Sequence, residues 1–300
     1  MPELPEVETV KRGLQKRLVG HCVLSYEILR DKSFPNSPES AKQFMVGAKI
    51  TSVKRRAKLL FINLNSDYSL VIHLKMTGQL VYRSSKGQRF GAGHPSDSLV
   101  GSLPDRSTRV IIHLDGADIF FNDQRVFGWI KLIPTDEISN MEFVKKLGPE
   151  PLEKEFTEEI FNKQIKRRKR SRVKAVLLDQ SVLAGMGNIY TDEALWSAQI
   201  HPERRIEDLN IDEVGRLHKA IIAVLNIGID KGGSTDRNYV DAEGRKGNYL
   251  DFANVFRQEG QQCHRCGGEI IKIRVAGRGT HLCPQCQSNK AQAISFDNHS

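Results

Sequence analysis

Residues 263–286 read CHRCGGEIIKIRVAGRGTHLCPQC and hold four of the chain's five cysteines. The four form two Cys-x-x-Cys pairs with 16 residues between them. This spacing fits a tetrahedral zinc site better than a disulfide framework. Four thiolates fill the coordination shell of zinc and leave no position for water, so we expect one structural Zn²⁺ and no catalytic metal. The expected ligands are Cys263, Cys266, Cys283 and Cys286.

The residues between the cysteine pairs favour two short strands, at 269–275 and 279–282, so the zinc would pin a β-hairpin. Upstream, the chain from about residue 150 is helical in character. Thr157 and Ser171 are candidate N-caps. Asn210 begins a longer apolar periodicity, which ends at Gly232-Gly233.

The N-terminal part combines one helix with several strands. Pro5 suits the first helical position, and apolar residues then recur at helical spacing until Gly20. Asp115-Gly116 is a hairpin turn between two strand-like stretches. No long helix separates the strand-rich segments, which favours an antiparallel sandwich or barrel. These segments are residues 22–29, 49–64, 68–83 and 109–134.

Residues 84–107 contain 12 Gly, Ser or Pro among 24 and predict a structureless, mobile insertion. Residues 289–300 have the character of a disordered tail.

The charge of the chain points to a polyanionic partner. Lys and Arg total 45 against 36 acidic residues, which gives +9 and a pI near 9.3. Nucleic acid and an acidic membrane surface both remain open on this basis. Residues 163–174 alone carry eight basic side chains, although such a run can also be a solvated face. No leader peptide or long apolar segment is visible, so we expect a cytoplasmic protein.

The first residues suggest amine chemistry. Trimming of Met1 before a small residue would leave Pro2 with a free secondary amine. An α-amino group has a pKa of roughly 7.7–8.0 against about 10.4 for lysine, so more of it is unprotonated at neutral pH. A free amine is the nucleophile of Schiff-base chemistry. Glu3 could shuttle protons beside it, whereas Glu6 could simply favour the helix dipole.

Three stretches together resemble the formamidopyrimidine-DNA glycosylases: MPELPEVETV at 1–10, LDQSVLAGMGNIYTDEALW at 178–196 and GRGTHLCPQCQ at 277–287. They occur in the family's order over nearly the whole chain. The resemblance implies a multidomain α+β fold with an N-terminal antiparallel β-sandwich and helix, a helix-two-turn-helix domain and a four-cysteine zinc finger. The expected limits are 1–135, 136–250 with a lesion-recognition loop at 232–250, and 251–288.

The resemblance also implies the activity: a DNA glycosylase and abasic-site lyase that excises 8-oxoguanine and formamidopyrimidines from duplex DNA. Pro2 matches the nucleophile that attacks C1′ and forms a Schiff base, followed by β- and δ-elimination. Glu3 matches the glutamate that protonates the sugar ring oxygen. Glu6 matches a second glutamate of the opening motif, which we assign to the DNA-binding set. Lys58 matches a phosphate-binding lysine that supports catalysis.

Further matches concern contacts with DNA. Met76, Arg125 and Phe127 match the residues that fill the void left by an extruded nucleotide, although by pattern alone Met76 and Phe127 suit a core. The residues matched to phosphate or lesion contacts are Arg106, Arg109, Lys174, Asn188, Arg237 and Arg278.

Some positions depart from the family. Arg106-Ser107 stands where the family commonly has a Lys-His pair, and Arg257-Gln258 stands where it has a Gly-Arg pair, which leaves the base preference open. An endonuclease VIII-like enzyme for oxidised pyrimidines is one alternative. A noncatalytic damaged-DNA-binding protein is another, although it would need neither Pro2 nor Glu3. A zinc-dependent nuclease conflicts with a saturated zinc site. The resemblance implies a monomer.

Overall fold

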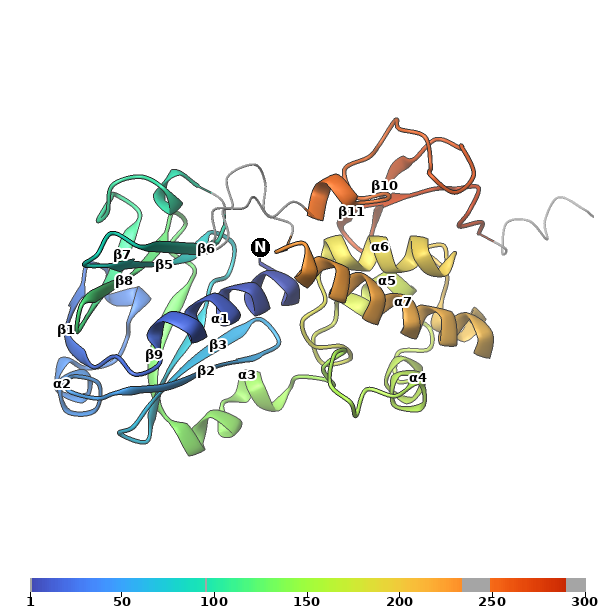
Figure 1. The fold of residues 1–300 in the computed structure, drawn as a ribbon. Helices are drawn as coiled ribbons and strands as arrows, with labels where there is room; N and C mark the ends of the chain where they lie inside the picture. Colours follow the sequence, from blue (N-terminus) through green and yellow to red (C-terminus); the bar gives the residue numbers. More distant parts are fainter. Residues whose placement is uncertain (1, 95, 234–248, 290–300) are drawn as a thin grey trace, which may run out of the picture. The chain divides into compact units, whose positions relative to one another are not determined.

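The computed structural model describes residues 2–94, 96–233 and 249–289 (Figure 1). Two compact units share the chain. The first comprises Met1–Lys145 and Ile229–Asn248, and the second comprises Lys146–Gly228 and Tyr249–Ser300. Arg237, most of the predicted lesion-recognition loop and the tail from residue 290 lie outside the described residues.

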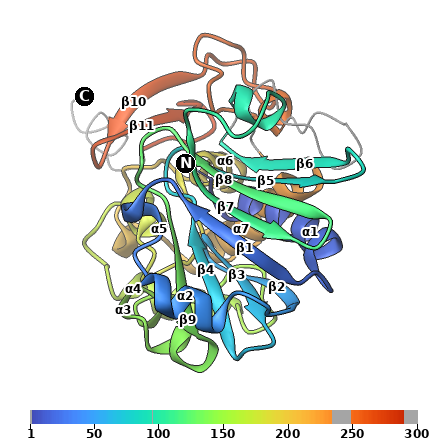
Figure 2. The same ribbon diagram turned by 90° about the vertical axis from the view of Figure 1, so that its left-hand side faces the viewer.

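The first unit is built on two antiparallel sheets (Figure 2). The five-stranded sheet has the order β1-β7-β8-β5-β6: Val23–Ile28, Thr108–Leu114, Ala117–Asp123, Gly78–Ser84 and Arg89–Gly93. The four-stranded sheet has the order β2-β3-β4-β9: Ile50–Arg56, Leu59–Leu64, Tyr68–His73 and Trp129–Pro134. Alternate residues of both sheets enter one apolar core, as expected for packed antiparallel sheets. The predicted sandwich and the Asp115-Gly116 hairpin are confirmed.

Helix α1 (Leu4–Leu18) completes this unit. Its apolar stripe of Val7, Val10, Leu14 and Leu18 is fully buried. The helix packs against β2 and β6, which are edge strands of the two sheets. It therefore lies against one edge strand of each sheet. The helix that the sequence predicted is confirmed, with Pro5 in its first turn.

The prediction that residues 84–107 are structureless is wrong. They contain β6, which pairs with β5, and a short 3₁₀ helix, η2 (Asp97–Leu99). Leu99 and Leu103 join Val81, Ile111 and Phe120 in a second apolar cluster. The glycines serve close backbone approach, because a Cβ on Gly93 would lie 2.5 Å from the carbonyl oxygen of Gly78. Gly-rich composition therefore marked a tightly apposed edge strand.

Two short helices, η1 (Asp31–Ser33) and α2 (Pro38–Phe44), lie between β1 and β2. Two more, η3 (Thr135–Asn140) and α3 (Glu142–Lys145), follow β9. The sequence analysis did not anticipate them. Ser37 caps α2 by accepting a hydrogen bond from the backbone N–H of Ser40 at 3.2 Å.

The second unit is mainly helical. It contains α4 (Glu158–Lys166), α5 (Val173–Leu178), α6 (Asn188–Ala198), η4 (Ile206–Asp208), most of α7 (Ile211–Asp230) and η5 (Tyr249–Phe252). Thr157 caps α4, and the side chain of Asn210 accepts the backbone N–H of Glu213 at 2.9 Å. Ser171 is not the cap of α5, because that helix begins one residue later and Arg172 occupies the cap position. In the part of the chain with described coordinates, no helix is long and apolar enough to cross a membrane.

The predicted hairpin is present as β10 (Ile271–Val275) and β11 (Arg278–Leu282). The two turn residues, Ala276 and Gly277, both have positive φ, 49° and 76°. Two such residues characterise the tight turn whose twist matches antiparallel strands. Arg278 is the first residue after this turn, so the hairpin presents it at its tip.

Candidate active site

The start of the chain is held by a reciprocal cap on α1. The backbone N–H of Glu3 donates to Glu6 Oε2 at 2.7 Å, and the Glu3 carboxylate accepts the backbone N–H of Glu6. Both side chains are buried, with 4% and 6% of their surface exposed. Such a box satisfies two donors of the first turn and fixes the path of the chain into the helix. It therefore fixes the residue before the cap, Pro2, which is also buried.

Glu6 helps to position Glu3. Its side chain is turned inward to Glu3 and leaves little surface for a ligand. Gly233 approaches it with φ +86°, and a Cβ on this glycine would lie 3.0 Å from Glu6 Oε1. The predicted contact of Glu6 with DNA stays a prediction.

Lys58 lies at the β2–β3 turn with 6% of its surface exposed, and Leu59 pairs with His73 on the neighbouring strand. His73 is also buried, and its Nδ1 accepts the backbone N–H of Lys75 at 3.0 Å. Burial, followed by the charges of Lys75 and Lys58, lowers the pKa of His73 to about 3. The ring is therefore neutral at pH 7, with its proton on Nε2. His73 was not among the predicted site residues, although it lies three residues before Met76.

The three residues predicted to fill the DNA void are exposed on two loops of the first unit. Met76 and Phe127 expose 40% and 47% of their surfaces, so the core interpretation of these two residues is wrong. Arg125 is exposed too, and its guanidinium carbon lies 4.9 Å from the centroid of the Phe127 ring. Large apolar side chains presented to solvent in this way suit insertion between bases.

A single buried carboxylate, Asp123, holds both loops. Its Oδ1 accepts the hydroxyl of Thr77 and the backbone N–H of Arg125, the latter at 3.1 Å. Its Oδ2 accepts the backbone N–H groups of Phe127 and Gly128 at 2.8 and 2.6 Å. Asp123 was not predicted from the sequence. It ties the residue after Met76 to the loop that carries Arg125 and Phe127.

Arg106 and Arg109 lie beside these loops. Arg106 is exposed, as a phosphate contact requires. Arg109 is half-buried, and its guanidinium donates to the carbonyl oxygens of Asp123 and Arg106 at 2.8 and 3.0 Å. Arg109 therefore orders the backbone around Arg106, and its contact with DNA stays a prediction.

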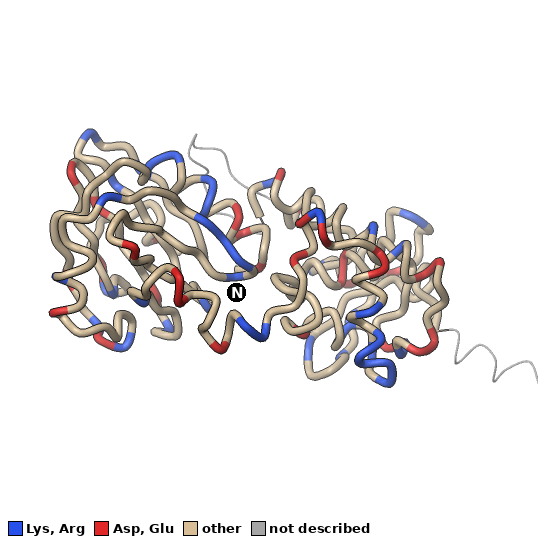
Figure 3. The backbone as a smooth tube through the Cα atoms, turned by 90° about the horizontal axis from the view of Figure 1, so that it is seen from below, with Lys and Arg blue, Asp and Glu red and all other residues tan. Residues whose placement is uncertain are grey.

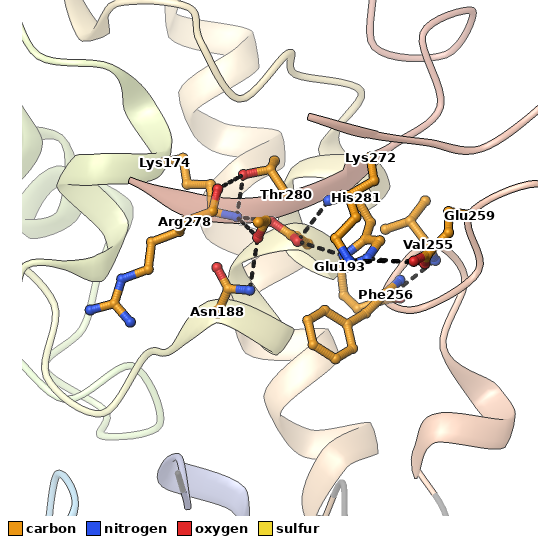
Figure 4. Close-up of polar contacts among 12 residues, drawn as sticks. Lys174, Asn188, Glu193, Val255, Phe256, Glu259, Lys272, Arg278, Thr280 and His281 are labelled. Carbon is orange, nitrogen blue, oxygen red and sulfur yellow. Dashed lines mark hydrogen bonds and ion pairs between the residues drawn. The ribbon is translucent and has the colours of Figure 1, made fainter. Parts of the chain in front are cut away.

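In the second unit, Asn188 is the first residue of α6 and follows Gly187 at the cap position. Its Nδ2 donates to the carbonyl oxygen of Gly279 at 3.0 Å (Figure 4). Arg278 is exposed, and its side chain points away from the polar network (Figure 4). The structure thus brings the two predicted phosphate-binding residues of this unit to neighbouring positions.

Lys174 does not have the predicted role. None of its surface is exposed, and its Nζ donates to Asp192 Oδ1 at 2.6 Å and Thr280 Oγ1 at 2.7 Å. A fully buried ammonium cannot contact a DNA phosphate, so the prediction of a direct contact is wrong. The other seven basic residues of 163–174 are exposed. Figure 3 shows Lys and Arg distributed over both units.

The four cysteines fit zinc. Their Sγ atoms all lie within 4.8 Å of one another, with 3.8 Å between Cys263 and Cys286 and 3.4 Å between Cys266 and Cys283. Sulfurs placed about 2.3 Å from a tetrahedral zinc stand about 3.8 Å apart. Burial and the neighbouring thiols raise the pKa of Cys286 to about 12, whereas a bound dication keeps its ligand thiols deprotonated.

Comparison with known proteins identifies the class. The model of the formamidopyrimidine-DNA glycosylase N-terminal domain matches residues 1–130. The model of the formamidopyrimidine-DNA glycosylase H2TH domain matches 147–239, and that of a zinc finger found in FPG and IleRS matches 260–289. These modules together define a DNA-repair glycosylase with a structural zinc finger. The predicted domain limits at 135, 250 and 288 stay predictions.

A formamidopyrimidine-DNA glycosylase of Pelotomaculum thermopropionicum is 44% identical over 97% of this chain and 100% of its own length. Two structures of the Lactococcus lactis enzyme, one of a mutant with DNA containing Fapy-dG and one with abasic-site DNA, each superpose with a TM-score of 0.84. Each is 35% identical and covers 96% of this chain and 100% of its own. The chain therefore belongs to the formamidopyrimidine-DNA glycosylase family, which confirms the predicted family, fold and zinc finger.

Proposed function

We propose that this protein excises oxidised purines, 8-oxoguanine and formamidopyrimidines, from duplex DNA and then cuts the strand, with Pro2 as the nucleophile. The observation that carries the proposal is the reciprocal cap between Glu3 and Glu6. The cap fixes the backbone at Glu3, the residue next to Pro2, and Glu3 carries the carboxylate. An amine with a neighbouring carboxyl group is what Schiff-base chemistry with proton transfer requires.

The first step joins enzyme and sugar. After removal of Met1, the unprotonated nitrogen of Pro2 attacks C1′ of the damaged nucleotide. The new N–C1′ bond forms as the glycosidic bond breaks, and the base leaves with its electron pair and takes up a proton. The Pro2 nitrogen loses its hydrogen as a proton, which balances the proton taken up by the base. Glu3 then donates a proton to the sugar ring oxygen and the C1′–O bond opens. The product is a cationic iminium on Pro2, the Schiff base of a secondary amine, with no hydrogen on nitrogen.

The second step cuts the strand. The Schiff base acidifies the hydrogen on C2′, whose removal expels the 3′ phosphate. Loss of the C4′ hydrogen then expels the 5′ phosphate, and water hydrolyses the Schiff base and frees Pro2. Each elimination removes one proton and one phosphate leaving group, so no redox partner is needed.

Access to C1′ requires the nucleotide to leave the base stack. We assign Met76 and Phe127 to the space it vacates and Arg125 to the unpaired opposite base. Lys58, Asn188 and Arg278 would bind phosphates near the lesion, because phosphate contacts fix a duplex in register. Arg237 keeps its predicted lesion contact. We further propose that the protein acts as a monomer in the bacterial cytoplasm, with gel filtration as the test of its mass.

Borohydride trapping tests the nucleophile. Protein with a free Pro2 is incubated with a labelled duplex that contains 8-oxoguanine opposite cytosine, and the Schiff base is reduced to a stable adduct. Protein with an uncleaved N-terminal tag is the matched control and should form no adduct. An adduct that maps to a lysine, or one that forms despite the tag, would refute the role of Pro2. Binding without any adduct would instead favour the noncatalytic alternative.

A second duplex with thymine glycol tests lesion choice. Faster excision of thymine glycol than of 8-oxoguanine would favour the endonuclease VIII-like alternative over the purine-specific proposal.

A further inference from the structure

A buried ion pair joins the helices of the second unit to the zinc hairpin. Lys174 on α5 and Asp192 on α6 approach to 2.6 Å, and neither side chain is exposed. A buried pair is costly to form unless further hydrogen bonds satisfy both groups. Residues of β11 supply such bonds: Lys174 Nζ donates to Thr280 Oγ1 at 2.7 Å and to the Gly279 carbonyl oxygen at 3.2 Å.

Asp192 extends the same attachment by one residue. Its second oxygen, Oδ2, accepts the backbone N–H of His281 at 2.9 Å. Three consecutive residues of β11 are therefore held by one ion pair, and all three follow Arg278 directly. The Gly279 carbonyl oxygen also accepts Asn188 Nδ2 at 3.0 Å (Figure 4). Asn188 and Lys174 thus share one acceptor, on the residue next to Arg278.

The base of the zinc finger has a separate attachment. Glu193 accepts the backbone N–H groups of Asn254, Val255 and Phe256, each at 2.9 Å. Val255 packs with Cys263, Cys283 and Ile270 in a small core near Trp196. The zinc finger therefore stays docked through Glu193 and this core even when contacts at the hairpin tip are lost.

We propose that Lys174 and Asp192 are positioning residues that hold Arg278 and Asn188 together as one phosphate-binding unit. The inference rests on the proposed function, because it assumes that Arg278 and Asn188 contact DNA. An apolar pair of similar volume would fill the same space, and such replacements of buried ion pairs are often neutral for stability. It would, however, donate nothing to Gly279 or Thr280, so the tip would lose its fixed position.

A double-mutant cycle tests this coupling. The variants are Lys174→Met/Asp192→Leu, Arg278→Ala and the combination of all three changes. The ligand is a duplex with a tetrahydrofuran abasic-site analogue, which is bound but not cleaved. Loss of a charge-assisted hydrogen bond corresponds to roughly 10- to 100-fold in Kd. We expect this loss for the apolar pair and for Arg278→Ala, and little further loss when they are combined.

The remaining measurements separate positioning from folding. The apolar pair should retain one zinc per chain and the melting temperature of the wild type. Lys272→Ala is the matched control. Lys272 lies on β10 of the same hairpin, and its exposed Nζ pairs with Glu259 Oε1 at 3.3 Å. This variant should leave Kd unchanged.

Multiplicative effects in the cycle would overturn the inference, since they would mean that the ion pair acts without Arg278. Loss of zinc in the apolar pair would also overturn it, because the ion pair would then support the finger itself. A wild-type protein that neither binds this duplex nor forms an adduct would refute the proposed function. If the wild type binds the duplex and forms the borohydride adduct, but the losses in Kd of the variants multiply, this inference alone is refuted.

Discussion

At the scale of single residues, the charged groups on α1 secure the helix that carries Pro2. Glu8 Oε2 accepts Arg55 Nε of β2 at 2.9 Å, and its Oε1 accepts Arg12 Nε at 2.9 Å. Burial alone would raise the pKa of Glu8, but its hydrogen bonds with Arg55 and Arg12 outweigh burial and lower it. A carboxylate with a lowered pKa stabilises the fold above its unfolded pKa, about 4.3, and this contribution is lost as the pH falls through the folded pKa.

We therefore expect Glu8→Gln to destabilise the protein in a pH-dependent way. Urea unfolding at pH 7 should show a loss of about 2 kcal/mol, because Arg55 loses its charged partner. Near pH 3 the difference between wild type and variant should shrink, since the wild-type carboxyl is then becoming neutral as well. An equal loss at both pH values would show that the charge of Glu8 contributes nothing.

The zinc ligands could be predicted residue by residue, because metal binding requires particular residue types at a particular spacing. The four cysteines have a diagnostic spacing, and the structure brings their sulfurs together. The roles of Pro2 and Glu3 stay predictions from their motif. The prediction that Lys174 contacts DNA was wrong for a physical reason. A run of basic residues predicts an exposed surface, yet Lys174 turns inward to the buried Asp192. Asp123 and His73 were missed because their roles depend on partners that strand pairing brings together.

At the scale of elements, strand β6 packs directly against helix α1. Phe90 on this strand is 3% exposed and lies against Gly13 of α1, where a Cβ would stand 2.0 Å from Phe90 Cζ. The guanidinium carbon of Arg17 lies 4.7 Å from the centroid of the same ring. The helix was predictable from its periodicity. The strand was not, because its glycines and serines have the composition of a loop.

This packing predicts that the effect of Gly13→Ala on the free energy of unfolding changes sign when Phe90 is removed. Phe90→Ala should lower the free energy of unfolding by about 3–5 kcal/mol, and Gly13→Ala by about 1–3 kcal/mol, through a cavity and overpacking respectively. In the Phe90→Ala background, Gly13→Ala should instead stabilise, because its methyl group enters the vacated space. Thermal and urea unfolding of the four proteins measure the effect. Losses that simply add would contradict the direct contact.

At the scale of the whole molecule, the two compact units depend on different forces. The first has an apolar core between two sheets. The zinc finger has only a small cluster around Val255, Cys263, Ile270 and Cys283, and a core of this size needs a metal to remain folded. The order of these parts could be predicted from the sequence. The grouping of the chain into units could not, because it depends on long-range packing.

We expect a strong chelator to affect the zinc finger but not the fold of the first unit. Removal of zinc should abolish binding to abasic-site duplex, because Arg278 loses its hairpin, while the β-sheet circular dichroism and the main unfolding transition remain. Added zinc should restore binding. Unchanged DNA affinity in protein shown to be metal-free would contradict the role of the hairpin.

Asp123 carries a consequence for how this protein can evolve. One carboxylate serves two loops at once, so neither loop can drift in sequence without reference to the other. An asparagine there would set an amide NH₂ against backbone N–H donors and disturb both loops in a single mutational event. A residue that need never touch DNA should therefore be as intolerant of change as the residues that do, and relatives should vary Gln124 and Val126 far more freely than this aspartate.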